Sequence, residues 1–323
     1  MWGTVFGHWE KEAKPTRKTV YSWKKIIGKL VAHLRGVPKV TEDEAMAWNA
    51  AEFTEDELIG WKNSLVTKLN PTTTGNHLTI LRTLYNYARD NRLVPASVAE
   101  GVSRVKYKGK RKPGTKRLGY TDGEAVAILT ATREESDPVL RWSPWLAAGT
   151  GFRIDEICGA MVADIEEANG AAFIHARLDE REKDAEQDAE IKTENAERVV
   201  PLHEALIEEG FLEYVASLPK DGPLFPGLKP DMFGRRGGNG SKRVGRWVRK
   251  KLGITDKRKS PSHAWRHRFR TICRNPVYQI PEDVADFMCG HGHGGEGRNY
   301  GEYRDAMVAA IAKLPSPLPG LRH

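Results

Sequence analysis

The hydrophobic residues of the first hundred positions repeat with the period of a helix. In one run they recur every three or four positions and share one face, formed by Val20, Trp23, Ile27, Leu30 and Leu34. Thr54 and Glu57 form a capping box that opens a second helix. Thr72 to Thr74 offer N-caps for a third, and Pro95 either ends that segment or begins the next turn. The pattern predicts a small all-helical domain of about four helices.

The positions after residue 117 mix helical and strand patterns. A capping box at Thr121 and Glu124 opens a helix, and Arg153 begins another. Short strands are expected at Ala171 to Ala176, 190–193 and 197–202. The remaining helices are expected at roughly 203–217, 240–252, 262–274, 281–289 and 302–314. The predicted fold class is therefore mainly α with a small antiparallel β-sheet: a helical domain, then a mixed α+β domain.

A basic segment separates the two patterns. Residues 105–117 read VKYKGKRKPGTKR, with seven Lys or Arg, no acid, two glycines and a proline. Such a composition is typical of a flexible linker. The sequence thus predicts a helical domain at 1–104, a basic interdomain linker at 105–117, and a second domain with a C-terminal tail helix at 118–323.

The charge of the chain favours a polyanionic partner. The formal net charge is +8 and the isoelectric point is about 9.3, which fits nucleic acid. From Arg235 to Lys259, eleven Lys or Arg stand against one acid. Trp247 and Val248 fall there at helical spacing, so an amphipathic helix with a basic outer face is expected. Basic residues of the segment 105–117 and of this helix are weak candidates for DNA contact: Lys106, Lys108, Lys110, Arg111, Lys112, Lys242, Arg243 and Arg246.

Cysteine usage and hydropathy indicate the compartment. Three scattered cysteines, none of them in a CxxC pair, make no disulfide framework and favour a reducing environment. The sequence has no signal peptide and no apolar run as long as the about 18 residues of a membrane-spanning helix. We expect a cytoplasmic, nucleoid-associated protein without a membrane partner.

The residues with marked chemical character fall at three places. Arg153 follows two glycines, in Gly149-Thr-Gly-Phe-Arg. His263 and Arg266 are three residues apart, so on a helix they share a face. Tyr300 lies downstream. Two arginines, a group of histidines and a tyrosine, without a metal-binding box, suit one chemistry: they hold a phosphodiester while a phenol oxygen attacks it.

These motifs resemble those of the tyrosine recombinases, also called phage integrases. The second domain resembles their catalytic domain and the helical domain resembles their core-binding domain. The matching pieces occur in the family's order: Thr150 to Ile157 for the first arginine motif, Lys192 to Leu202 for the β-hairpin lysine motif, His263 to His267 for the His-x-x-Arg box, and Gly290, His291 and Tyr300 for the last histidine and the nucleophile. The resemblance covers nearly the whole chain.

The resemblance implies a catalytic set and a mechanism without metal, nucleotide or other cofactor. Two arginine forks would clamp the non-bridging oxygens of the phosphodiester, and Tyr300 would attack phosphorus to form a 3′-phosphotyrosyl link. Lys192 would protonate the leaving 5′-oxygen, and the histidines would bind the phosphate or assist proton movement. The candidate catalytic residues are Arg153, Lys192, His263, Arg266, His291 and Tyr300.

Two neighbours of this set would support it. Glu156 lies one helical turn after Arg153 and is expected to hold a catalytic side chain in place. His267 is expected to pack against its neighbours or orient them.

One part of the chain departs from the family pattern. The loop from His291 to Asn299 is rich in glycine, where the family usually has Ser, Thr and an aliphatic residue. The nucleophile therefore stays open between Tyr300, which fits the spacing, and Tyr303, which would share its helical face. No arm-binding domain precedes the core-binding-like sequence, so a fragment of a longer integrase and a family member without that domain both remain open.

The resulting hypothesis is a site-specific recombinase that integrates or excises a mobile element. Its expected partners are double-stranded DNA attachment sites, three further copies in a synaptic homotetramer (the free chain being a monomer), and a directionality factor. The alternatives are a type IB topoisomerase-like enzyme that relaxes DNA and a catalytically silent DNA-binding relative. An apolar stripe on the terminal helix either covers its own core or docks onto a neighbouring protomer; it comprises Met307, Val308, Ile311 and Leu314.

Overall fold

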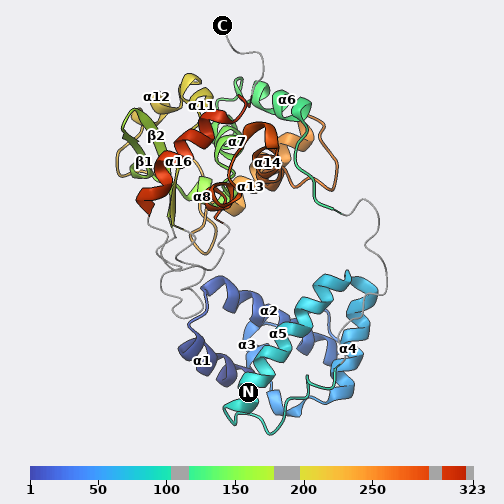
Figure 1. Ribbon diagram of the computed structural model, residues 1–323. Coiled ribbons are helices and arrows are strands. Elements are labelled where there is room, and N and C mark those ends of the chain that lie inside the picture. Colours follow the sequence, from blue (N-terminus) through green and yellow to red (C-terminus); the bar gives the residue numbers. More distant parts are fainter. Residues whose placement is uncertain (103–115, 178–196, 291–299, 318–323) are drawn as a thin grey trace. The chain divides into compact units, whose positions relative to one another are not determined.

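The computed structural model describes residues 1–102, 116–177, 197–290 and 300–317, and for 300–303 the backbone alone (Figure 1). These residues divide into two compact units. The first unit holds residues 1–102, and the second holds the described residues from 116 onward. Each unit has its own hydrophobic core. The predicted domain limits at 104 and 105 lie outside the described residues, so the domain boundaries stay a prediction.

The first unit consists of helices. They are α1 (Trp2–Ala13), α2 (Arg17–Leu34), α3 (Glu42–Ala47), α4 (Glu55–Lys68) and α5 (Pro71–Asp90), with a 3-10 turn at Ala50–Glu52. The capping box of Thr54 and Glu57 opens α4 as predicted. The prediction of the cap of α5 was wrong: Asn70 accepts from the Thr73 amide, and Pro71 fills the first helical position. The prediction of about four helices gave no positions for α1 or α3.

The core of the first unit is aromatic. Trp2, at the start of α1, is fully buried. Its ring centroid lies 5.0 Å from that of Tyr85 and 5.9 Å from that of Phe53. Such tilted contacts add to the stabilisation from burial. Packing of Trp2 in this core thus stabilises α1, although the two glycines in α1 lower its intrinsic helix propensity.

The second unit is mainly helical. Its helices are α6 (Asp122–Thr132), α7 (Pro138–Thr150), α8 (Ile154–Gly159), α11 (Glu204–Glu208), α12 (Phe211–Ala216), α13 (Gly237–Lys250), α14 (Pro261–Cys273), α15 (Glu282–Met288) and α16 (Tyr300–Lys313), with 3-10 turns at Val162–Asp164 and Pro276–Tyr278. The capping box at Thr121 and Glu124 opens α6 as predicted. The helix predicted at 203–217 is instead two, because Gly210 takes φ 85° between them.

A three-stranded antiparallel sheet completes the second unit. Its strands β1 (Ile165–Ala168), β2 (Ala171–Ala176) and β3 (Arg198–Pro201) pair in the order β1-β2-β3. The strand at 171–176 was predicted, whereas β1 was not. Asn169 and Gly170 join the two with positive φ at both positions, the turn that Asn-Gly favours in hairpins. The strand predicted at 190–193 lies outside the described residues. The predicted fold class, mainly α with a small antiparallel sheet, is confirmed.

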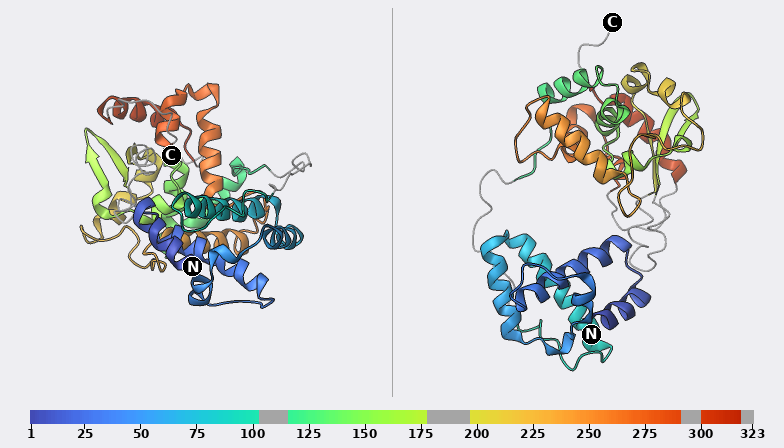
Figure 2. Two further views of the ribbon diagram at one scale, coloured as in Figure 1. Left: turned by 90° about the horizontal axis from the view of Figure 1, so that it is seen from below. Right: turned by 180° about the vertical axis from the view of Figure 1, so that it is seen from behind.

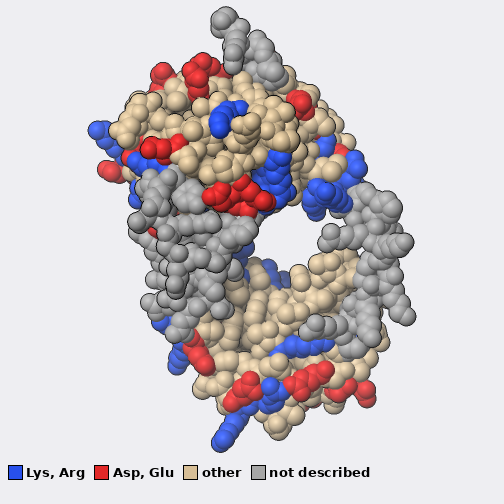
Figure 3. All heavy atoms as spheres, in the orientation of Figure 1, with Lys and Arg blue, Asp and Glu red and all other residues tan. Residues whose placement is uncertain are grey.

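Helix α14 packs against α7, and α13 contacts both of these helices (Figures 1 and 2). Helix α13 has the predicted amphipathic form: Trp247 and Val248 are buried, while Lys242 and Arg246 are exposed. Arg and Lys side chains are visible at the right-hand edge of this unit in Figure 3. Several of the eleven basic residues from 235 to 259 pair with carboxylates, among them Arg243 with Asp137, Lys251 with Glu135, Arg258 with Asp256 and Lys259 with Glu124.

The C-terminal helix α16 packs on its own unit. It contacts β3 and α15. Its buried apolar residues are Met307, Ala310 and Ile311, and Leu314, directly after the helix, is buried too. His203 contacts the carbonyl of Leu314 at 3.3 Å. Met307, Ile311 and Leu314 of the predicted stripe therefore cover the core of their own unit, while Val308 is half-buried. Docking of this helix onto a neighbouring protomer stays a prediction. Within the described residues, none of the helices has both the length and the apolar character that crossing a membrane needs.

Candidate active site

A tight turn between α7 and α8 sets the position of Arg153. Gly151 ends α7 in the left-handed region, at φ 66°, and a Cβ there would lie 2.6 Å from the ring of Phe269. Two residues later, Arg153 is the N-cap of α8. Its amide donates to Oε2 of Glu156 at 2.6 Å and its Nη1 donates to Oε1 at 3.0 Å. The contact predicted for Glu156 is therefore present, and it fixes an arginine whose side chain is 43% exposed.

The same carboxylate holds a second arginine, Arg198, which was not among the predicted site residues. Arg198, on β3, has a side chain only 1% exposed. Its Nη2 and Nη1 donate to the two oxygens of Glu156 at 2.9 and 3.2 Å, and its Nε donates to the carbonyl of Met288 at 2.8 Å. The guanidinium carbon lies 4.4 Å from the ring centre of Phe152. Glu156 thus joins the exposed Arg153 to the buried Arg198.

The pKa of Glu156 reflects this pairing. Burial, the largest single influence, raises the pKa, but the charge and hydrogen bonds of Arg198, with those of Arg153, outweigh it and leave the pKa below its ordinary value. Glu156 is therefore ionised at neutral pH. A fixed negative charge at this point keeps both guanidinium groups in place.

Arg266, on α14, is buried and bonded to the backbone. The residue stands near the middle of α14 and is 3% exposed. Its Nη1 donates to the carbonyl of Gly151 at 2.9 Å and its Nη2 donates to the carbonyl of Cys289. Burial lowers its pKa to about 10, and the nearby positive charges of Arg153 and Arg198 act in the same direction. Two carbonyl bonds fix the plane of this guanidinium fork, whose terminal nitrogens each carry two hydrogens.

Two histidines stand on the same helix. The rings of His263 and His267 are 5.0 Å apart and nearly perpendicular. Burial lowers the pKa of both, and neighbouring positive charges add to this: Arg266 for each of them, and Arg153 for His263. Both rings are therefore neutral at neutral pH. A neutral imidazole has one donor and one acceptor nitrogen, so His263 is suited to accept a proton or bind a phosphate oxygen.

The structure brings together three of the six predicted catalytic residues. Arg153, His263 and Arg266 come from α8 and α14 and influence one another electrostatically. Glu156 pairs with the guanidinium groups of Arg153 and Arg198, and its charge also acts on the guanidinium of Arg266. A net positive charge remains among these four side chains, which suits an anion.

The other predicted residues are placed less fully. Tyr300 begins α16, and its backbone alone is described. Lys192, His291 and the linker candidates Lys106, Lys108, Lys110, Arg111 and Lys112 lie outside the described residues. On α13, Lys242 and Arg246 are exposed, while Arg243 pairs with Asp137 at 2.9 Å. In the part of the chain that the structure describes, no three His, Cys, Asp or Glu gather as a metal site.

An ion pair ties the beginning of α16 to the sheet. Arg304, one turn after Tyr300, donates to Oε2 of Glu166 on β1 at 2.7 Å, and its guanidinium lies 4.7 Å from the ring centre of Phe173 on β2. His175 bonds to the same carboxylate oxygen at 2.6 Å. These contacts fix the direction in which the helix enters the unit, and with it the backbone at Tyr300.

Comparison with known proteins gives matches by structure. No family model and no curated protein matches the sequence. A lambda integrase (75–356) dimer bound to a COC′ core site matches at TM-score 0.57 and 16% identity, over 94% of this chain and 95% of that one. A lambda integrase tetramer bound to a Holliday junction matches at 0.57 and 16%, over 92% and 79%. The Tn1549 transposon integrase in complex with circular intermediate DNA matches at 0.51 and 15%, over 87% and 94%. At these identities the similarity concerns the fold, and the chain has the fold of the tyrosine recombinases.

Proposed function

We propose that this protein is a site-specific DNA recombinase that cleaves and rejoins DNA through a 3′-phosphotyrosyl intermediate. The observation that carries the proposal is the meeting of Arg153, His263 and Arg266 in a positively charged site of a tyrosine-recombinase fold. A phosphodiester gains charge on its non-bridging oxygens as it approaches the transition state, and fixed guanidinium groups stabilise that charge.

In the proposed reaction the phenol oxygen of Tyr300 attacks phosphorus. A bond forms between phosphorus and this oxygen, and the bond from phosphorus to the 5′-oxygen breaks. A neutral His263 is suited to take up the phenol proton, and Lys192 would give a proton to the leaving 5′-oxygen. Rejoining reverses these steps with the 5′-hydroxyl of another strand as the nucleophile. The energy of the phosphodiester is kept in the phosphotyrosine, so no nucleotide is consumed.

The proposed substrate is a pair of double-stranded DNA attachment sites, recombined to integrate or excise a mobile element. Recombination cuts four strands, so four protomers would meet in the synapse. Among proteins of this fold, lambda integrase has been seen as a dimer on a core site and as a tetramer on a Holliday junction. A net charge of +8 favours such a polyanionic partner.

Covalent trapping on DNA tests this proposal. Suicide duplexes from the DNA flanking the gene would be incubated with the protein, and adducts resolved on a denaturing gel and mapped by mass spectrometry. We expect the wild type to form an adduct through Tyr300. Tyr300→Phe should keep DNA binding and lose the adduct, because this change removes the attacking oxygen and leaves the ring.

Tyr303→Phe is the matched control and should still form the adduct. An adduct that survives in Tyr300→Phe and disappears in Tyr303→Phe would move the nucleophile by one helical turn. Relaxation of a supercoiled plasmid without any attachment site would favour the topoisomerase alternative. Binding without an adduct on any substrate would favour the silent relative.

A further inference from the structure

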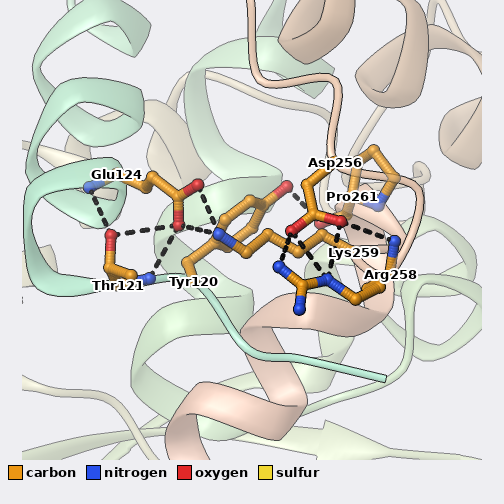
Figure 4. Close-up of polar contacts among 7 residues, drawn as sticks. All are labelled: Tyr120, Thr121, Glu124, Asp256, Arg258, Lys259 and Pro261. Atoms are coloured by element: carbon orange, nitrogen blue, oxygen red, sulfur yellow. Dashed lines mark hydrogen bonds and ion pairs between the residues drawn. The ribbon is translucent and has the colours of Figure 1, made fainter. Parts of the chain in front are cut away.

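The segment that leads into the second unit is fixed along the first half of α14. The amide of Leu118 donates to the carbonyl of Arg258 at 3.2 Å. The buried Tyr120 donates its hydroxyl to the carbonyl of Pro261 at 2.8 Å (Figure 4), and its ring centre lies 4.8 Å from that of Trp265. Residues 117–120 therefore belong to the folded body of this unit.

Gly119 brings this segment against the backbone of α14. A Cβ at this position would lie 2.6 Å from the amide nitrogen of Arg268 and 2.9 Å from its Cα. It would also lie 3.1 Å from the carbonyl carbon of His267. Backbone atoms cannot yield as a flexible side chain can, so only glycine allows this approach. The contact places the segment beside the helix turn that carries His267.

Side-chain contacts also hold the loop before α14, residues 256–259. Lys259 donates to both carboxylate oxygens of Glu124 at 2.5 and 2.6 Å, and Glu124 in turn accepts from the Thr121 amide at 2.8 Å (Figure 4). Arg258 and Asp256 pair within the loop at 2.8 Å. The carbonyls of this loop are thus held at fixed positions.

Arg117 is the exposed cation of this fixed segment. Its Nη1 donates to the carbonyl of Lys257 at 3.0 Å. Its charge is close enough to lower the pKa of both His263 and His267. Within the described residues, no carboxylate pairs with it. A guanidinium has five N–H donors, and one carbonyl bond orients the group without exhausting them.

We propose that Arg117 binds a DNA phosphate next to the scissile phosphate. This inference rests on the proposed function, since it assumes that the scissile phosphate lies at Arg153 and Arg266. The charge of Arg117 adds to a site that already carries net positive charge, and the segment that Arg117 opens lies against the backbone of α14 at His267. A second phosphate of the same strand offers the charge and the paired oxygens that this guanidinium lacks. Contact with the backbone would fix the register of the strand, whatever its sequence.

Neutral phosphate analogues can test this directly. Duplexes with a single methylphosphonate at each position near the cleavage site would be bound by the wild type, Arg117→Gln and Lys116→Ala. Gln keeps an N–H donor for the Lys257 carbonyl and removes the charge. Lys116 is the adjacent exposed cation, for which the structure gives no hydrogen bond or ion pair, so its variant controls for the loss of one charge.

The expected result is a loss of contact at one phosphate. In the wild type and Lys116→Ala, a methylphosphonate beside the scissile position should weaken binding by about tenfold. Arg117→Gln should bind unmodified DNA about tenfold more weakly and show no further loss at that position. Its slope of log affinity against log salt should also fall by about 0.9, the value for one phosphate contact. Arg117→Ala would replace Arg117→Gln if the latter melted early.

Two other results have distinct meanings. If the Arg117 variant responds to every methylphosphonate as Lys116→Ala does, Arg117 makes no specific phosphate contact and the inference is overturned. The adduct assay on the wild type decides the proposed function separately. A wild type that forms the adduct while Arg117→Gln binds normally leaves the recombinase proposal standing and removes Arg117 from it.

Discussion

The two sides of the candidate site hold their arginines in different ways. On the α14 side, Arg266 is buried and bonded to two backbone carbonyls, those of Gly151 and Cys289. On the α8 side, Arg153 is exposed and bonded to a carboxylate that also neutralises the buried Arg198. The first arrangement depends on neutral groups that do not titrate. The second depends on the charge of Glu156, so we expect the α8 side to respond to pH and to the loss of Arg198.

Replacing Arg153 or Arg266 with lysine should have the largest effect on cleavage, and the stability of the two variants should distinguish the two sides. Arg153→Lys and Arg266→Lys keep the charge and lose the bidentate fork. We expect cleavage to fall by at least roughly 100-fold in both, or about 2.7 kcal/mol, with much smaller changes in DNA affinity. Single-turnover adduct formation at saturating DNA would measure this.

The same two variants should differ in stability. Lysine at 266 cannot serve both carbonyls, so a buried acceptor is left unpaired and the melting temperature should fall. Lysine at 153 is exposed and should melt like the wild type. Equal losses in binding and cleavage would mean that the arginines act as phosphate anchors alone, and equal melting temperatures would remove the difference between the two sides.

Removing Arg198 should lower the stability of the α8 side. Arg198→Met fills a similar volume but leaves Glu156 without its buried partner, which typically costs about 3–5 kcal/mol of unfolding free energy. Urea denaturation of the second unit would report this loss. Adding Glu156→Gln should recover part of it, since the unpaired charge is then gone. A double variant no more stable than Arg198→Met would show that Arg198 acts through Phe152 or Met288 instead.

The smallest effect should come from pH, again on the α8 side. The folded-state pKa of Glu156 lies below its ordinary value of 4.5. Its pairing therefore contributes stability that is fully present above pH 4.5 and is lost as pH falls through the folded-state pKa. Thermal melts from pH 7 to pH 3 should show a steeper decline for the wild type than for Glu156→Gln. Parallel curves would indicate that Glu156 is not preferentially ionised in the folded state.

Elements with a local signal were predictable from the sequence. The capping boxes at Thr54 and Thr121 mark the starts of α4 and α6, and the apolar spacing around Trp247 marks α13. Helix α7 was missed because it is buried on most sides and so lacks a polar face. In addition, Pro144 lies inside α7, and a proline in a sequence usually indicates the end of a helix.

The site was predictable as a set of residues but not as an arrangement. Arg153, His263 and Arg266 stand in recognisable motifs, and the fold brings them together. That Arg266 is buried while Arg153 is exposed depends on the packing of α7 against α14. Arg198 was missed because its partner, Glu156, lies 42 residues earlier. A lone arginine in a strand has no local signal that it will be buried.

The close approach of Gly119 to α14 has a consequence for protein engineering. A chimera that attaches a foreign module to the second unit must keep residues 117–120, because the hydroxyl of Tyr120 and the glycine at 119 contact the helix that carries His263. A fusion joint placed after Gly119 would remove part of the folded body of this unit. A joint that keeps Arg117 and the residues after it would preserve the contacts of this segment with α14 and with the loop before it.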